Sequence, residues 1–364
     1  MADLHEQRRS IYTFYLMQND CETLKEIALQ IRNAIFGPCI TPYMALFCRA
    51  TQECLGISLL TPELDAEIYD IRNSIKFYAD RYGKSKQRII QNDKLQDEEY
   101  RVQLRFNFMK KLNLYYNLGI FFDNNLHVIG NTQQLADLLN LNKLKNAEKK
   151  EKAQKIAYNI GSVIGKISTS FSALSSAPSI QINDNLPPIF YCDQNTNISK
   201  FFSSDYEKDV NLFLLHILCN IGFVKYLLEQ VVPNTNPWIF RIKYIVTYYS
   251  FLGVKKLKAH IENNFLNTYE PLIREIKVIS ETGNILFTSK FRNCMMHYDL
   301  SKDGVFAISD TFFDEGKIFY GLVEDCFSGK TYEKFYEDLS AFSNKIEELL
   351  AKQFDFSKVN LRKI

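Results

Sequence analysis

The second half of the chain carries apolar side chains at helical spacing over long stretches, and this pattern constrains the fold more than any other feature. Between residues 205 and 232 apolar side chains recur every three or four positions, and Pro233 follows them. The same spacing returns over residues 254–281 and 331–354. Helices of this kind bury their apolar stripes against one another. The sequence therefore predicts a helical bundle over residues 205–356.

The first half is also predicted to be mostly helical. Apolar residues follow helical spacing over residues 4–35. Thr61 followed by Pro62 is typical of a helix start, with the threonine as N-cap and the proline in the first turn. Residues 102–108 alternate between apolar and polar, which is the period of a strand. We expect a mostly helical N-terminal domain over residues 1–167, whose role the sequence does not reveal.

The segment between the two halves has a different composition. Residues 168–204 are rich in Ser, Asn, Pro and Asp and show no periodicity, so we interpret them as a linker or a long connecting loop. Before them, residues 143–155 form a lysine-rich run, which indicates either a solvated helix face or a contact to an RNA backbone. Within the bundle, residues 304–321 are predicted to form a short extended insertion.

Composition narrows the class of protein. The chain has 28 Phe and 21 Tyr but only 14 Gly, which favours helices packed through aromatic side chains over an α/β nucleotide-binding fold. A net charge of +2 means that any nucleic-acid binding must come from local patches. Eight Cys at irregular spacings indicate reduced thiols in a cytosol.

No targeting or membrane segment is predicted. The first residues lack the basic start and apolar run of a signal peptide. The most apolar segment, residues 210–232, is interrupted by polar side chains, which is typical of a buried helix and not of a membrane span. We therefore expect a soluble, cytoplasmic protein that does not bind membranes.

Several well-known catalytic motifs are missing. The chain has no G-x-x-x-x-G-K-[ST] or G-x-G-x-x-G loop for nucleotide phosphates, and neither H-E-x-x-H nor G-x-S-x-G occurs. The best metal-like pair is His216 with Cys219, but both lie in an apolar helix and are interpreted as core residues. The sequence thus predicts no metal and no cofactor.

One stretch, residues 291–300, combines side chains suited to phosphate chemistry. In a helix, Asn293 and His297 lie four positions apart and share a face, and Arg292 lies about 100° round from Asn293. An imidazole titrates near neutral pH, and a guanidinium presents a fork of donors that fits phosphate oxygens. Two further Arg-Asn pairs, at positions 32–33 and 72–73, have no following histidine and do not carry the pattern.

This stretch resembles the signature of the HEPN superfamily, in which an arginine is followed by a polar residue and then by a histidine after four to six positions. Arg292, Asn293 and His297 match it residue by residue. The resemblance covers about residues 205–356 and does not extend to residues 1–200. It implies a helical bundle that cleaves RNA without a metal, as a homodimer in which two motifs face each other. Many members act as toxins or antiphage defence effectors, so an antitoxin or a regulatory partner is also implied.

The chemistry of RNA cleavage is consistent with these residues. Attack of a 2′-hydroxyl on the neighbouring phosphate needs a base, an acid and stabilisation of the added negative charge. His297 suits either proton transfer, Arg292 suits the phosphate, and Asn293 suits orientation of the imidazole or the phosphate. One chain supplies one such histidine and a symmetric dimer supplies two. The basic residues expected to bind RNA nearby are Lys290, Lys277 and Arg274.

The alternative is a helical module that binds RNA or a partner protein without cutting. In that case Arg292 and His297 pair with carboxylates at a helix end. The two hypotheses differ in what they require of the structure. The enzyme needs both side chains partly exposed beside other basic residues, whereas a structural role is compatible with burial.

Overall fold

The computed structural model confirms a mainly α-helical fold. It describes residues 2–56, 60–103, 115–142, 144, 146–176, 178–264, 267–302 and 305–363. The helices of the first half are α1 (Ala2–Gln30), α2 (Phe36–Leu55), α3 (Pro62–Ser74), α4 (Tyr82–Gln103), α6 (Thr132–Leu138) and α7 (Asn146–Ser172). Those of the second half are α8 (Lys208–Phe223), α9 (Glu229–Val231), α10 (Pro237–Asn263), α11 (Glu270–Leu286), α12 (Ser289–His297), α13 (Leu322–Cys326) and α14 (Tyr332–Ala351).

Capping residues set several of the helix starts. Thr61 is the N-cap of α3, as its sequence predicts, and its hydroxyl accepts a hydrogen bond from the backbone N–H of Leu64. Thr331 caps α14 in the same way. A side-chain oxygen at this position satisfies one of the N–H groups that have no partner within the helix. Local sequence therefore determines where these helices begin.

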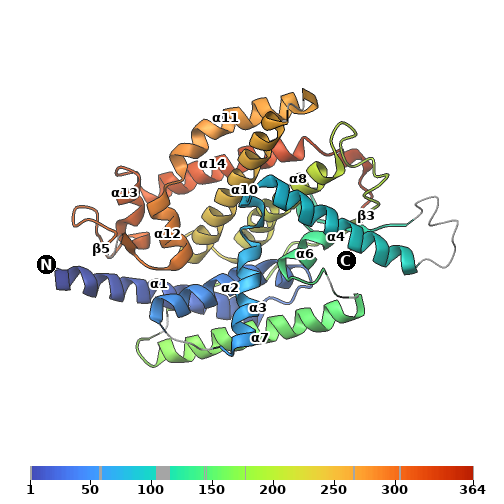
Figure 1. The fold of residues 1–364 in the computed structure, drawn as a ribbon. Coiled ribbons are helices and arrows are strands. Elements are labelled where there is room, and N and C mark those ends of the chain that lie inside the picture. The colour runs from blue at the N-terminus through green and yellow to red at the C-terminus, as the bar shows by residue number, and fades with distance from the viewer. Residues whose placement is uncertain are drawn as a thin grey trace.

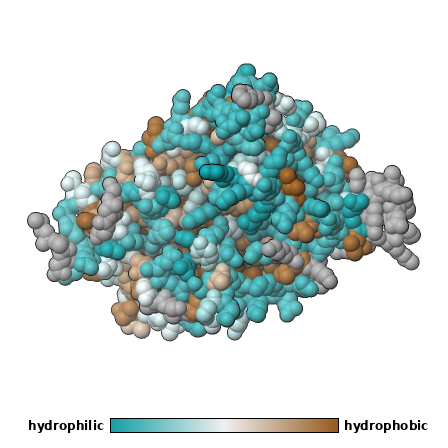
Figure 2. Space-filling model, in the orientation of Figure 1, coloured by the Kyte–Doolittle hydropathy of each residue, from teal (hydrophilic) through white to brown (hydrophobic). Residues whose placement is uncertain are grey.

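The most apolar helix forms the centre of the molecule. Helix α8 continues through a π-helical turn, η2 (Val224–Leu228), into α9. The span Lys208–Val231 is long and apolar enough to cross a membrane, but 83% of its most apolar window is buried inside the protein. Its apolarity therefore reflects a position in the core. On the face shown in Figure 2, hydrophobic residues are scattered among hydrophilic ones.

A small antiparallel sheet joins segments from both halves of the chain. Its strands are arranged in the order β2 (Val128–Asn131), β1 (Leu118–Phe122), β3 (Phe190–Gln194) and β6 (Arg362–Lys363). The interpretation of residues 168–204 as a linker or long connecting loop is corrected in part, because α7 extends to Ser172 and β3 pairs with both β1 and β6. The sequence missed this because β3 is short and only its cross-strand partners make it a strand. Most of the predicted 102–108 strand lies outside the described residues, and positions 102–103 end α4.

The hydrophobic core does not divide at the predicted domain boundary. Buried residues from α1, α2 and β1 belong to the same cluster as those from α8, α10 and α14. Figure 1 shows α1, α2 and α7 along one side of the molecule and α11 and α14 along the other, with α10 between them. The N-terminal half thus packs directly on the predicted bundle.

The inserted segment of the bundle is held by helix α1. A two-stranded hairpin forms between β4 (Ser301–Lys302) and β5 (Val305–Phe306), whereas residues 318–321 form a 3-10 turn instead of a strand. From α1, the Tyr12 hydroxyl donates to Oε1 of Glu315 and Arg8 Nη1 donates to Oδ1 of Asp310, both at 2.5 Å. The insertion therefore links the two halves of the molecule.

A buried ion pair fastens α1 to α10 beside the end of α12. Asp20 and Arg241 are both 0% exposed, and Arg241 Nε donates to Asp20 Oδ2 at 2.9 Å. The Tyr298 hydroxyl donates to the same oxygen at 2.5 Å. Arg241 Nη1 also donates to the backbone carbonyls of Cys294 and Met295, at 3.1 and 2.8 Å. One side chain thus positions three segments of the chain.

Removing the carboxylate of this pair should be costly. In Asp20→Asn, the Arg241 guanidinium stays buried without its counter-charge, so we expect the free energy of unfolding to fall by about 3–5 kcal/mol. Urea denaturation of the full chain measures this change. A matched control is Glu270→Gln, which breaks an exposed 3.2 Å pair with Arg274 and should cost less than about 1 kcal/mol. Equal losses in the two variants would contradict a dominant role for the buried pair.

Candidate active site

Helix α12 carries the arginine and the histidine of the motif. Its N-cap is Thr288, whose hydroxyl accepts a hydrogen bond from the backbone N–H of Phe291 at 3.3 Å. One face of the helix is buried and consists of Phe291, Cys294, Met295 and Met296. The predicted helix is therefore confirmed, with its apolar side packed into the core and its polar side turned outward.

The end of α12 is fixed by the Arg241 cluster. Tyr298 follows the last helical residue in the left-handed region, with φ of 59°, which is unfavourable for a residue with a side chain. Its buried ring lies under the Arg241 guanidinium, whose carbon is 3.8 Å from the ring centroid. Arg241 also binds the last carbonyls of the helix, which favour a positive charge. His297 therefore occupies a defined position at the helix end.

The three motif residues differ in exposure. Asn293 and His297 are both exposed, as their shared face predicts. Arg292 is half-buried, and its Nε is buried without a hydrogen-bond partner among the residues that the structure describes. Burial raises the pKa of the neighbouring Tyr249 to about 12. The positive charge of Arg292 and its hydrogen bond to the Tyr249 hydroxyl oppose this shift. The guanidinium thus retains a free donor.

His297 lies between a carboxylate and a positive charge. Its side chain is 46% exposed, and Nδ1 lies 3.5 Å from Oε2 of Glu53, which comes from α2. Burial and then the charge of Arg72 lower the pKa of His297, and Glu53 opposes this shift. A lowered pKa favours the neutral imidazole at neutral pH, which is the form that accepts a proton.

Two basic residues of the N-terminal half belong to the same site. Arg72, near the end of α3, is only 5% exposed, and its Nε and Nη2 have no hydrogen-bond partner within the described ranges. Lys76 is half-buried just after the helix. Burial first, and then the charges of Arg72 and Arg292, lower the pKa of Lys76, and Glu53 opposes them. We call Arg72, Lys76, Arg292 and His297 the cationic cluster.

One carboxylate faces the cationic cluster. Although partial burial opposes the shift, a hydrogen bond from Arg49 and the charges of Arg72 and His297 lower the pKa of Glu53. Arg49 also binds Asp65 at 2.8 Å. Glu53 therefore interacts with both Arg49 and the cationic cluster. Its one negative charge does not balance the positive charges of Arg72, Lys76 and Arg292.

Sequence reasoning missed Arg72, Lys76 and Glu53. Arg72 precedes an asparagine, and this pair seemed uninformative because no histidine follows it. The only local signal is the i, i+4 spacing of Arg72 and Lys76, because like charges at this spacing destabilise a helix. That signal is weak, and more than 200 positions separate these residues from Arg292. Only the packing of the two halves brings them together.

The three other predicted RNA-binding residues lie elsewhere or are already paired. Lys290, in the first turn of α12, forms an ion pair with Asp325. On α11, Lys277 is 3.7 Å from Glu262, near the end of α10. Because Arg241 is 21 residues earlier on α10, this point lies about 30 Å along the helix from the end of α12. The structure brings neither Lys277 nor Arg274 to the cationic cluster.

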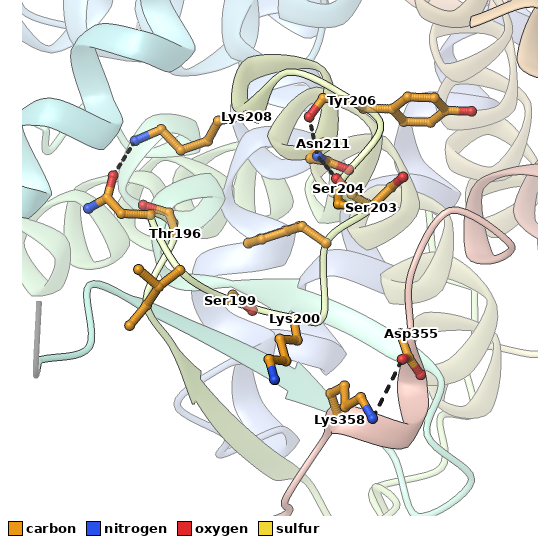
Figure 3. A pocket seen from close by; sticks show the side chains of 13 residues that line it. Thr196, Ser199, Lys200, Ser203, Ser204, Tyr206, Lys208, Asn211, Asp355 and Lys358 are labelled. Carbon is orange, nitrogen blue, oxygen red and sulfur yellow. Dashed lines mark hydrogen bonds and ion pairs between the residues drawn. The ribbon is translucent and has the colours of Figure 1, made fainter. Parts of the chain in front are cut away.

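A pocket of about 550 Å³ lies at a different place in the molecule, between the start of α8 and the C-terminal turn η5 (Phe356–Lys358). Figure 3 shows three lysines among its lining residues, Lys200, Lys208 and Lys358. Two of these charges are compensated, because Lys208 lies 2.6 Å from Asp93 and Lys358 lies 4.0 Å from Asp355. None of the lining residues belongs to the cationic cluster, which has the larger excess of charge.

The described part of the chain contains no candidate metal site. No set of three or more His, Cys, Asp or Glu side chains there is arranged to hold a metal ion. His216 is 1% exposed, and burial, with a smaller contribution from Arg88, lowers its pKa to about 3. Cys219 accepts a hydrogen bond from Asn131 at 3.2 Å. Both are core residues.

In comparisons with protein-family models, with curated proteins and with solved structures, nothing matches this chain. The resemblance of residues 291–298 to the HEPN signature therefore rests on the motif, the helical context and the side chains around them.

The titration of His297 reports the composition of the site. In Arg72→Gln a positive neighbour is lost, so the pKa of His297 should rise, and in Glu53→Gln the loss of the carboxylate should lower it. NMR titration of the imidazole signals measures both shifts, with His297→Gln used for assignment. Arg32→Gln changes an exposed arginine that also precedes an asparagine and should have no effect. An unchanged pKa in both site variants would show that Arg72 and Glu53 do not act on the imidazole.

Proposed function

We propose that this protein is a metal-independent endoribonuclease of HEPN type. The observation that carries the proposal is the cationic cluster, in which Arg292 and a partly exposed His297 meet two further basic residues. Within the described part of the chain, Arg72 and Arg292 both retain guanidinium donors without a hydrogen-bond partner. Such donors suit the oxygens of a phosphate.

His297 is suited to act as the base. Its lowered pKa keeps the imidazole neutral, so that Nε2 or Nδ1 accepts the proton of the 2′-hydroxyl as the oxygen attacks phosphorus. The bond to the 5′-oxygen then breaks, which leaves a 2′,3′-cyclic phosphate and a 5′-hydroxyl that takes up a proton. Arg292 stabilises the negative charge that accumulates on the phosphate oxygens. The second proton transfer needs an acid, which the histidine of a second protomer supplies.

The biological setting that we propose follows the family resemblance. A cytoplasmic ribonuclease that acts as a toxin or an antiphage effector must be kept inactive until it is needed. The pair between His297 and Glu53 supports such restraint, because the carboxylate holds the imidazole from α2 of the N-terminal half. None of the eight cysteines, all within the described ranges, forms a disulfide, which suits a reducing compartment.

Cleavage of single-stranded RNA by the purified protein tests this proposal. We expect cleavage in the presence of a chelator, and a loss of about 100-fold or more in rate for His297→Ala and for Arg292→Ala. DNA of the same sequence should stay intact because it lacks the 2′-hydroxyl. Arg32→Ala is the matched control and should cleave at the wild-type rate. Equal cleavage by wild type and His297→Ala would contradict the proposed role of the histidine.

A heterodimer distinguishes a composite site from two independent ones. If each cleavage uses one histidine from each protomer, a dimer of one wild-type and one His297→Ala chain should lose nearly all activity. If the protomers act independently, that dimer should retain about half the activity. Differently tagged chains, co-expressed and purified through both tags, provide the sample. Half-activity would rule out the shared site.

The second candidate is a helical module that binds RNA or a protein without cutting. The 3.5 Å pair between His297 and Glu53 favours it, because this contact also satisfies the imidazole in a purely structural role. Binding of RNA by wild type and His297→Ala alike, with no cleavage by either, would support this function over the first.

A further inference from the structure

Arg72 is a buried charge whose hydrogen-bonding capacity is only partly used. Its side chain is 5% exposed, and neither Nε nor Nη2 has a partner among the described residues. A buried guanidinium with unpaired N–H groups is unfavourable unless an anion or a polar group binds it. The position of these donors therefore points to a ligand with several acceptor oxygens.

Lys76 adds a second positive charge from the same face. It follows Arg72 by four residues, just past the end of α3, and is half-buried, with a pKa lowered first by burial and then by its positive neighbours. Arg292 lies on α12, and its Nε also has no hydrogen-bond partner among the residues described. These three basic groups interact electrostatically with one another or with Glu53, and the 3.5 Å contact between Glu53 of α2 and His297 of α12 places the two parts of the chain side by side here.

A bound anion would reduce the electrostatic repulsion within this group of basic side chains. Each added negative charge removes part of the repulsion among Arg72, Lys76 and Arg292, and phosphate oxygens accept hydrogen bonds from guanidinium forks. Three basic groups and one carboxylate leave an excess of two positive charges when the imidazole is neutral. The charge balance favours a ligand with two negative charges over a singly charged one.

We propose that Arg72 and Lys76 of the N-terminal half, together with Arg292, form a binding site for a dianionic phosphoryl group, and that the Glu53 carboxylate competes with that group. The inference deepens the proposed function, because a phosphodiester reaches this charge when a 2′-oxygen adds to phosphorus. Phosphate binding itself does not depend on cleavage. Arg72 and Lys76 are positioning residues for the phosphate, and the N-terminal half is part of the site.

Inorganic phosphate is the probe that tests the site directly. Phosphate should raise the thermal unfolding midpoint of the full-length protein more than chloride at the same ionic strength, since a ligand that binds only the folded state stabilises it. We expect about tenfold weaker apparent phosphate affinity in Lys76→Gln and in Arg72→Lys, which keeps the charge but loses the fork. Glu53→Gln should bind phosphate more tightly, because the competing carboxylate is gone. Arg32→Gln should match wild type.

The outcomes separate this inference from the nuclease proposal. If phosphate stabilises wild type no more than chloride does, or if Lys76→Gln and Arg72→Lys respond like wild type, the phosphate site is disproved even where RNA is cleaved. If phosphate binds as expected and RNA is not cleaved, the site stands and the nuclease proposal fails. A single-stranded RNA oligonucleotide with and without a 3′-phosphate distinguishes the source of the group. Stronger binding of the phosphorylated form indicates a dianionic terminal phosphate, whereas equal binding would contradict the preference for a dianion, because each backbone phosphodiester carries one negative charge.

Discussion

The buried contact between Arg241 and Asp20 is the interaction on which the candidate site depends. An arginine that is 0% exposed binds a carboxylate of α1, the last carbonyls of α12 and the face of a tyrosine ring at the same time. A buried pair of this kind contributes little net stability compared with an apolar packing of the same shape, but it specifies one geometry. That geometry sets the end of α12, and therefore the position of His297.

This contact also explains why the N-terminal half is not an appended domain. Asp20 belongs to α1, Arg72 and Lys76 belong to α3 and the turn after it, and Glu53 belongs to α2. Each of them meets the second half at or near α12. A bundle of residues 205–356 alone would leave Arg241 without its counter-charge and the motif without its basic neighbours. The two halves are consequently one structural unit around the site.

The environment of His297 is a balance of opposing effects. Burial and Arg72 favour the neutral imidazole, whereas Glu53 favours the protonated one. A base needs the neutral form and an acid needs the protonated form, so loss of the contact to Glu53 would shift the imidazole further toward the base. The same carboxylate also competes for the guanidinium groups. Arg72 and Glu53 are thus the residues through which the N-terminal half influences the protonation of His297.

The sequence by itself determined the helices and the motif, because both depend on local spacing. The apolar stripe of α8, the N-cap at Thr61 and the shared face of Asn293 and His297 all follow from the period of the helix. Only the tertiary structure decided which residues surround the motif. Arg72 and Lys76 precede Arg292 by more than 200 positions, and strand β3 is stable only beside its partners. Packing brings such residues together through contacts that no local pattern encodes. The sequence therefore indicated Lys277 and Arg274 as neighbours of the motif, whereas in the structure Arg72 and Lys76 are its neighbours.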